Sequence, residues 1–236
     1  ELMPVAHWAA QPLPTEIVCW GAKGHALTIL QEGEAVWRGR VQLRAFVDEE
    51  AHGHDHPVLG VPVISPAERL ATLPGATVLV GVNNPGARAR IQAQVVAEGG
   101  SVLTFVGDVR QVHPSARLGP GVLVALHTRI GPGTVIEAGA HVFSTMVSHD
   151  VHVGAAATLG PYSSILGHVD VGEGANVAPH AVVHNGSDGR RLTIGAGATV
   201  GVGAVVTRDV PEGGVVVGNP AMGVEEWRRL RALASQ

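Results

Sequence analysis

The stretch LGPGVLVALHTRIGPGTVIEAGAHV, residues 118–142, decides the fold, because an aliphatic residue returns in it at every sixth position. A period of six fits neither an amphipathic helix nor the two-residue alternation of an ordinary strand. It is the hexapeptide repeat of a parallel β-helix, in which three hexapeptides form one triangular coil that buries its aliphatic residues against neighbouring coils. The repeat runs in both directions through Val112, Leu118, Val124, Ile130, Ile136, Val142, Val147, Val153, Leu159, Ile165, Val171, Val177, Val183, Ile194, Val200 and Val206.

Two interruptions break this register. The step from Val142 to Val147 is one residue short, and it comes immediately before Ser148-His149-Asp150. The step from Val183 to Ile194 is five residues too long and contains a polar, basic loop, residues 184–191. Because irregularities in a regular scaffold are expected at functional sites, both interruptions mark candidate sites.

Composition bounds the class of protein. The 236 residues leave room for two domains. The chain is 45% hydrophobic but only 3% aromatic, a composition that suits a core of stacked aliphatic coils. A net charge of −4 gives no case for binding nucleic acid or an anionic membrane surface. The apolar runs are too short to insert into a membrane, and no signal-peptide pattern opens the sequence. With Cys19 as its single cysteine, the chain is expected to be a cytoplasmic protein without disulfides.

The first half of the chain has a different pattern. Residues 1–15 are rich in Pro and Ala, match no period and are expected to form a loose extension. Residues 16–106 alternate apolar strands with helices, which predicts a small Rossmann-like α/β domain with a parallel sheet and a fourth strand over residues 101–106. Residues 107–221 are then the β-helix. The segment 222–236 is predicted to be a terminal helix that packs on the end of the solenoid, with its polar side carrying Arg228, Arg229 and Arg231.

Polar residues follow three strands of the predicted α/β domain. The first strand runs into Gly21-x-x-Gly24-His25 before a helix, an arrangement that lets backbone N–H groups approach an anion. The alternative is an ordinary tight strand–helix turn, since the glycine spacing is not that of the dinucleotide fingerprint. Ligands of open α/β sheets bind beyond the carboxyl ends of the strands. That edge also carries Asp48, Glu49 and Asn83, so a nucleotide or nucleotide-sugar is the expected ligand.

The best catalytic pair of the β-helix is His149-Asp150. An imidazole accepts a proton near neutral pH, and a neighbouring carboxylate fixes its tautomer. One coil onward lies Gly167, whose N–H is expected to face a developing oxyanion. The alternative for any of the 13 histidines is a turn or surface residue. The gamma-class carbonic anhydrases are metal-binding β-helix trimers in which two of the histidine ligands lie five residues apart. In this chain the residue five positions after His149 is Gly154, so no metal is expected.

Three arginines are candidates for binding the phosphates of a cofactor. They are Arg190, Arg191 and Arg208. For the first two, a solvated surface position is the open alternative.

Together these residues resemble the hexapeptide-repeat sugar acyltransferases of the sialic acid O-acetyltransferase type, which include nucleotide-amino-sugar N-acetyltransferases. The resemblance covers about residues 16–221. It is carried by IVCWGAKGH (17–25), FVDE (46–49), VHPSA (112–116), SHDVHVG (148–154), IGAGATVG (194–201), VTRDVP (206–211) and VGNPA (217–221).

The resemblance implies a left-handed β-helix, a homotrimer with active sites between subunits, and acetyl-CoA as co-substrate. It also implies that His149 is the base, with Asp150 as its acidic neighbour, and that the amide of Gly167 holds the thioester carbonyl. The acceptor nucleotide would lie at Gly21, Gly24, His25, Asp48 and Glu49, and the CoA phosphates near Arg208.

The chain departs from the family pattern at four places. Lys23 replaces a small residue in the phosphate turn, and Thr158 replaces a histidine often found nine residues after the base. The loop 186–191 is extra, and the segment 31–44 does not follow the usual pattern.

The resemblance therefore implies an acetyl-CoA-dependent acetyltransferase acting on the amino group of a nucleotide-linked amino sugar. One alternative is transfer to a sugar hydroxyl, as in sialic acid O-acetylation. The other is a non-catalytic trimeric scaffold whose α/β domain binds a regulator. The acceptor sugar, its nucleotide and the pathway stay open.

Overall fold

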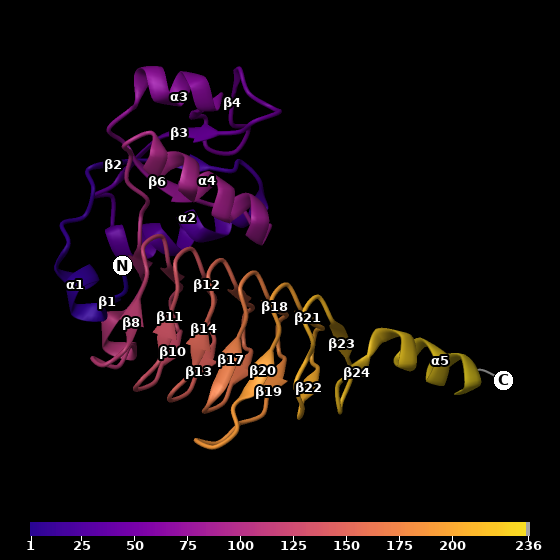
Figure 1. Cartoon of the computed structure of the whole chain (residues 1–236). Coiled ribbons are helices and arrows are strands. Elements are labelled where there is room, and N and C mark those ends of the chain that lie inside the picture. Colours follow the sequence, from indigo (N-terminus) through magenta and orange to yellow (C-terminus); the bar gives the residue numbers. More distant parts are fainter. Residues whose placement is uncertain (235–236) are drawn as a thin grey trace.

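Three sheets of short parallel strands form the sides of a triangular prism in the computed structural model, which describes residues 1–234 (Figure 1). The first sheet contains β8 (Arg117–Leu118), β11 (Val135–Ile136), β14 (His152–Val153), β17 (Val169–Val171) and β20 (Leu192–Ile194). The second contains β10 (Arg129–Ile130), β13 (Met146–Val147), β16 (Ser164–Ile165), β19 (Val182–Val183) and β22 (Val205–Val206). The third contains β7 (Phe105–Val106), β9 (Leu123–Val124), β12 (His141–Val142), β15 (Thr158–Leu159), β18 (Asn176–Val177), β21 (Thr199–Val200) and β23 (Val215–Val217).

The aliphatic residues of the repeat form the core of this prism. Successive coils place equivalent residues in register, so that Ile136 pairs with Val153 and Val153 with Val171. All three are buried, as are their counterparts on the other two sheets. Since each coil is covered only by its neighbours, the solenoid is stable as a stack and not coil by coil.

The α/β domain has a five-stranded sheet in the order β4-β5-β3-β2-β6. Its strands are β2 (Glu16–Trp20), β3 (Gln42–Val47), β4 (His54–Asp55), β5 (Pro62–Ile64) and β6 (Thr77–Val80), and all pairs except β4–β5 are parallel. Its helices are α2 (Gly24–Trp37), α3 (Pro66–Thr72) and α4 (Pro85–Ala97). Ser65 and Asn84 each accept the N–H three residues on and so start α3 and α4, each with a proline at the first turn.

The predicted fourth strand of this domain is wrong. Within residues 101–106, Val102 makes a single bridge to Val78, whereas β7 pairs with β9 and belongs to the third sheet of the solenoid. The chain changes partner because Phe105 is buried in an apolar cluster shared by the two domains, where its ring meets that of Trp37 edge-on. A short 3-10 turn (Val109–Gln111) then leads into the first complete coil.

The expectation of a loose N-terminal extension is also wrong. Residues 3–4 form β1 (Met3–Pro4), which pairs antiparallel with β8, and α1 (Val5–Ala10) follows. Val5 is buried, and the indole nitrogen of Trp8 donates a hydrogen bond to the carbonyl of Leu118 at 3.0 Å. The first coil has no preceding coil, so this segment covers its exposed end.

At the other end, β24 (Met222–Gly223) pairs antiparallel with β23, and α5 (Val224–Ala234) follows. The predicted packing of this helix on the solenoid holds only near its start. Farther along, α5 points away from the prism (Figure 1), and Leu230 and Leu233 are 45% and 61% exposed. The three arginines of its predicted polar side, Arg228, Arg229 and Arg231, are exposed. Within residues 1–234, no helix has both the length and the apolar character needed to cross a membrane.

Candidate active site

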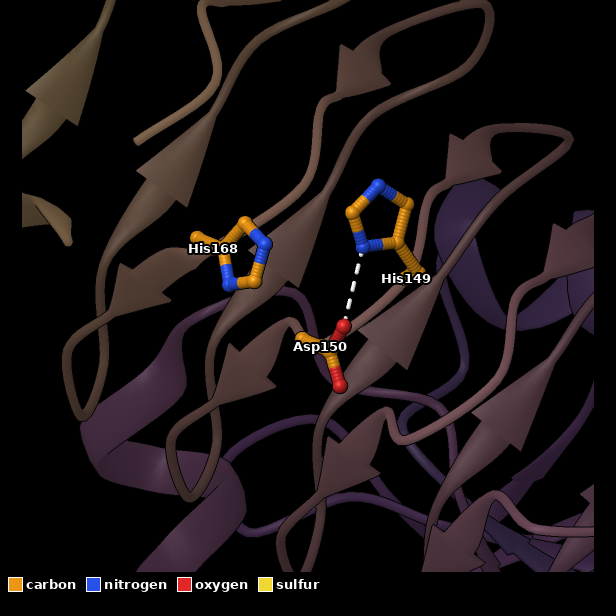
Figure 2. Close-up of side chains that lie close together, drawn as sticks. All are labelled: His149, Asp150 and His168. Atoms are coloured by element: carbon orange, nitrogen blue, oxygen red, sulfur yellow. Dashed lines mark hydrogen bonds and ion pairs between the residues drawn. The ribbon is translucent and has the colours of Figure 1, made fainter. Parts of the chain in front are cut away.

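The short step in the repeat places His149 and Asp150 in the turn between β13 and β14 (Figure 2). Asp150 has a φ of 54°, a left-handed conformation that aspartate tolerates better than most residues. Its Oδ2 lies 2.9 Å from Nδ1 of His149. Because an ionised carboxylate only accepts hydrogen bonds, Nδ1 carries the proton and Nε2 keeps the lone pair that a general base needs.

Gly167 lies directly against His149, as the sequence predicts. The pairing of β13 with β16 sets Val147 beside Ile165, which puts residue 167 one coil below residue 149. A Cβ atom on Gly167 would stand 2.5 Å from Cε1 of His149. The close approach of the ring to the backbone therefore requires glycine at this position.

A second histidine completes this corner, and sequence reasoning left it among the turn residues. The ring of His168 meets that of His149 edge-on, with 5.0 Å between the ring centroids. Its Nδ1 lies 3.3 Å from Oδ1 of Asp188, in the extra loop 186–191. Its position next to Gly167, one coil beyond His149, is the signal that could have identified it.

The extra loop supports the turn that carries His149 and Asp150. Nε of Arg191 donates to both carboxylate oxygens of Asp170 at 2.8 Å, and its Nη2 donates to the carbonyl of Asp150 at 2.8 Å. The hydrogen bond to Asp170 raises the pKa of Arg191 above its usual value. Arg191 is thus held by Asp170, whereas Arg190 is mostly exposed and its Nη2 lies 3.9 Å from Oδ2 of Asp209. Both arginines line a polar cavity of about 370 Å³ together with Arg208.

The α/β domain holds a separate cavity of about 520 Å³ beyond the carboxyl ends of β2, β3 and β6. Of the predicted acceptor residues, its lining contains Gly21, His25, Asp48, Glu49 and Asn83. Gly24 is not in the lining but is the first residue of α2. This is the edge of an open α/β sheet at which ligands bind.

The residues that line this cavity differ in charge and in backbone conformation. Gly21 has a φ of 106°, and a Cβ there would lie 3.0 Å from the carbonyl oxygen of Gly81, so the turn requires glycine. Burial opposes ionisation of Asp48, but hydrogen bonds from the N–H groups of Ala51 and Glu50 outweigh it and lower its pKa. Both carboxylate oxygens of Glu49 accept from Arg90. Lys23, a departure from the family pattern, also lines the cavity and adds a positive charge beside the start of α2.

A smaller cleft of about 280 Å³ lies where the α/β domain meets the third sheet, and it shares His25 and Asn83 with the first cavity. Its solenoid wall includes Phe143 and Thr158. Nε2 of His25 lies 3.5 Å from Nδ1 of the buried His141. Burial, and then the nearby charge of Arg88, lower the pKa of both histidines, so the pair is neutral at pH 7.

Arg88 joins the two domains beneath these cavities. The side chain, on α4, is fully buried, and burial lowers its pKa to about 10. Its guanidinium donates to six acceptors, namely the carbonyls of Val82, Asn83, Gly139, Ala156 and Ala157 and the hydroxyl of Thr158. Arg88 therefore ties the loop that lines the α/β cavity to the solenoid, where one of its partners, Thr158, lines the cleft.

The His149–Asp150 corner and the α/β cavity of one chain lie on opposite sides of the prism. The α/β domain covers the third sheet, through contacts such as Arg88 to Gly139 and His25 to His141. The turn that carries His149 joins the second sheet to the first, at the edge opposite the third. In Figure 1 the turns and the loop 184–191 on this edge project away from the α/β domain.

Comparisons with known proteins identify similar molecules. A family described as bacterial transferase hexapeptide (six repeats) matches residues 150–185, and a search of curated proteins found no match. The structure of PerB from Caulobacter crescentus in complex with CoA and GDP-perosamine is 31% identical over 91% of this chain and 99% of that one, with a TM-score of 0.74. A mutant of GDP-perosamine N-acetyltransferase from the same organism, with the same ligands, is 31% identical over the same shares, with a TM-score of 0.75.

A third structure is the acetyltransferase domain of PglB from Neisseria gonorrhoeae FA1090 in complex with acetyl coenzyme A. It is 27% identical over 90% of this chain and all of that domain (100%), with a TM-score of 0.77. These matches confirm the predicted combination of an α/β domain and a left-handed β-helix.

Proposed function

Because the chain belongs to the hexapeptide-repeat sugar acyltransferases, and so is an acyltransferase, we propose that it acetylates the amino group of a nucleotide-linked amino sugar with acetyl-CoA. The observation that carries this proposal is the pairing of an acceptor cavity at the strand ends with a separate His149–Asp150 corner. The complexes of similar proteins with CoA, acetyl-CoA and GDP-perosamine support both substrate classes.

The chemistry follows from the proton positions at the corner. Nε2 of His149 removes a proton from the acceptor amine as its nitrogen attacks the thioester carbonyl carbon. The N–H of Gly167 stabilises the oxyanion of the tetrahedral intermediate. When the carbon–sulfur bond breaks, CoA leaves as a thiolate and takes the proton held by His149. Asp150, 2.9 Å from Nδ1, stabilises the imidazolium in between.

The acceptor would bind with its nucleotide in the α/β cavity and its amino sugar toward the cleft. The N-terminus of α2, with Gly24 as its first residue, and the charge of Lys23 suit the diphosphate. Asp48 and Glu49 suit the hydroxyl and base groups of the nucleoside. Arg208 and Arg190, around the polar cavity beside the extra loop, suit the phosphates of CoA.

A homotrimer would complete this site. Since the base and the acceptor cavity of one chain lie on opposite sides of the prism, the cavity of one subunit must meet the His149 corner of another. Holding two substrates between subunits would also supply part of the rate acceleration through orientation.

Release of CoA thiol tests the proposed reaction. We expect release from acetyl-CoA with at least one compound in a panel of UDP- and GDP-linked amino sugars, and the acetylated product should carry an amide by mass spectrometry. Free sialic acid and nucleotide sugars without an amine serve as controls. Release with these hydroxyl acceptors alone would overturn the amine assignment, and a silent panel with acetyl-CoA still bound would overturn the acceptor class.

Mixed oligomers test the shared site. Ala87→Trp would fill the acceptor cavity, and His149→Asn would remove the base, so each variant alone should be inactive. When the two are co-expressed and assembled together, random mixing should restore roughly one quarter of the sites, because each site takes its base and its cavity from different subunits. Mixtures that stay as inactive as either variant would contradict a site between subunits.

A further inference from the structure

Three potential metal ligands meet at the catalytic corner. One donor atom each from His149, Asp150 and His168 lies within 4.8 Å of the other two. Figure 2 shows the two rings and the carboxylate turned toward one another across a small space. Two imidazoles and a carboxylate form a donor set that binds Zn²⁺ and leaves a fourth position open to water.

The surroundings of His168 also suit a metal ligand. Its Nδ1 lies 3.3 Å from the carboxylate of Asp188, so Nε2 is the nitrogen that faces His149. Histidines that bind metals commonly direct their other ring nitrogen to a carboxylate, which orients the ring and raises its basicity. Arg191 adds rigidity, because it donates to the carbonyl of Asp150. The extra loop, which carries Asp188 and Arg191, thus orients one ligand and fixes the backbone of another.

The distances between the ligand atoms suit a tetrahedrally coordinated ion after small rotations of the side chains. Bonds of about 2.0–2.2 Å to zinc imply separations between ligand atoms of roughly 3.3 Å. Nδ1 of His149 and Oδ2 of Asp150 are 2.9 Å apart, and both side chains are 49% exposed, so they are free to adjust. His168 is more enclosed and would act as the fixed ligand.

We propose that His149, Asp150 and His168 form an inhibitory site for a divalent transition metal ion such as Zn²⁺. The ion replaces the proton that Nδ1 of His149 shares with Asp150. A neutral imidazole coordinated through Nδ1 carries its proton on Nε2, so the lone pair that accepts the proton of the amine is lost. Metal binding and acetyl transfer therefore exclude each other. The inhibition rests on the proposed function, whereas the binding does not.

Metal binding to the 236-residue chain tests the site without any substrate. We expect about one equivalent of Zn²⁺ per chain by calorimetry, and Co²⁺ should give the intense visible absorption of a four-coordinate site. His168→Asn should weaken binding at least 10-fold, and Asp188→Asn by roughly 10- to 100-fold. His180→Asn is the matched control, because His180 is an exposed turn histidine with a φ of 60° against 56° for His168.

Activity supplies the second measurement. Zn²⁺ should inhibit thiol release by the unmodified protein, and EDTA should restore it. Relative to its own turnover without metal, His168→Asn should need at least a 10-fold higher Zn²⁺ concentration for half-inhibition of thiol release. Equal metal affinity for His168→Asn and the unmodified protein, or no binding below millimolar Zn²⁺, would overturn the proposal. An inactive protein that still binds Zn²⁺ through His168 would instead count against the proposed reaction alone.

Discussion

Replacing His149 with asparagine should lower turnover by about 10²- to 10⁴-fold, the range that general-base catalysis contributes. Asparagine fits the same turn and can still hydrogen-bond to Asp150, but it cannot accept a proton at neutral pH. The aliphatic core beneath the turn does not contain the side chain of His149, so the fold of the solenoid should be unaffected. Steady-state thiol release at saturating concentrations of both substrates measures the loss, and size-exclusion chromatography checks the assembly.

His152→Asn is the control for this experiment. His152 lies in the next strand, and its Nε2 pairs with Glu137 at 2.8 Å, away from Gly167. Its replacement should leave turnover within about 2-fold of the unmodified protein. Activity of His149→Asn that matches this control would show that another group removes the proton.

Replacing Arg88 with methionine should cause a large loss in the free energy of unfolding. Methionine fills similar space but leaves buried carbonyls from both domains, and the hydroxyl of Thr158, without their donor. Unsatisfied buried polar groups cost about 1–3 kcal/mol each, and part of that cost is relieved by relaxation. We expect a loss of about 3 kcal/mol in the free energy of unfolding, equivalent to a drop of roughly 6–12 °C in Tm for a chain of this size.

Arg90→Met provides the comparison on the same helix. Arg90 is 54% exposed and pairs with the 41% exposed Glu49, an arrangement whose removal costs about 0–1 kcal/mol. Differential scanning calorimetry of the two variants separates the buried contact from the surface pair. If Arg88→Met unfolds within about 1 °C of Arg90→Met, then the hydrogen bonds of Arg88 do not stabilise the contact between the two domains.

The solenoid could be predicted from the sequence because its repeat is local and periodic. The same register places Gly167 under His149, since one coil is a fixed number of residues. The short step before Ser148 likewise marks the turn that holds the His149–Asp150 pair. At the strand ends of the α/β domain, the rule for open sheets is enough to bring Gly21, Asp48 and Asn83 to one cavity.

Other features depend on contacts that no local pattern encodes. Residues 1–15 look irregular because their order comes from pairing with β8, more than a hundred residues away. Nothing in the local pattern singles out Arg88, and only the meeting of two domains buries it against carbonyl groups. The cluster of His149 with His168 arises from neighbouring coils and not from a spacing along one turn, so a search for histidines five residues apart cannot find it.

The two antiparallel strands at the ends of the prism bear on how the protein avoids polymerising. A stack of parallel coils ends in unpaired backbone groups, and such an edge can recruit the matching edge of another molecule and grow into a fibre. Here β1 runs against the first sheet at one end, and β24 runs against the third sheet at the other. Their reversed direction presents a different hydrogen-bonding pattern to an incoming parallel coil at one of the three sheets on each end, so both ends of the prism oppose growth along its axis.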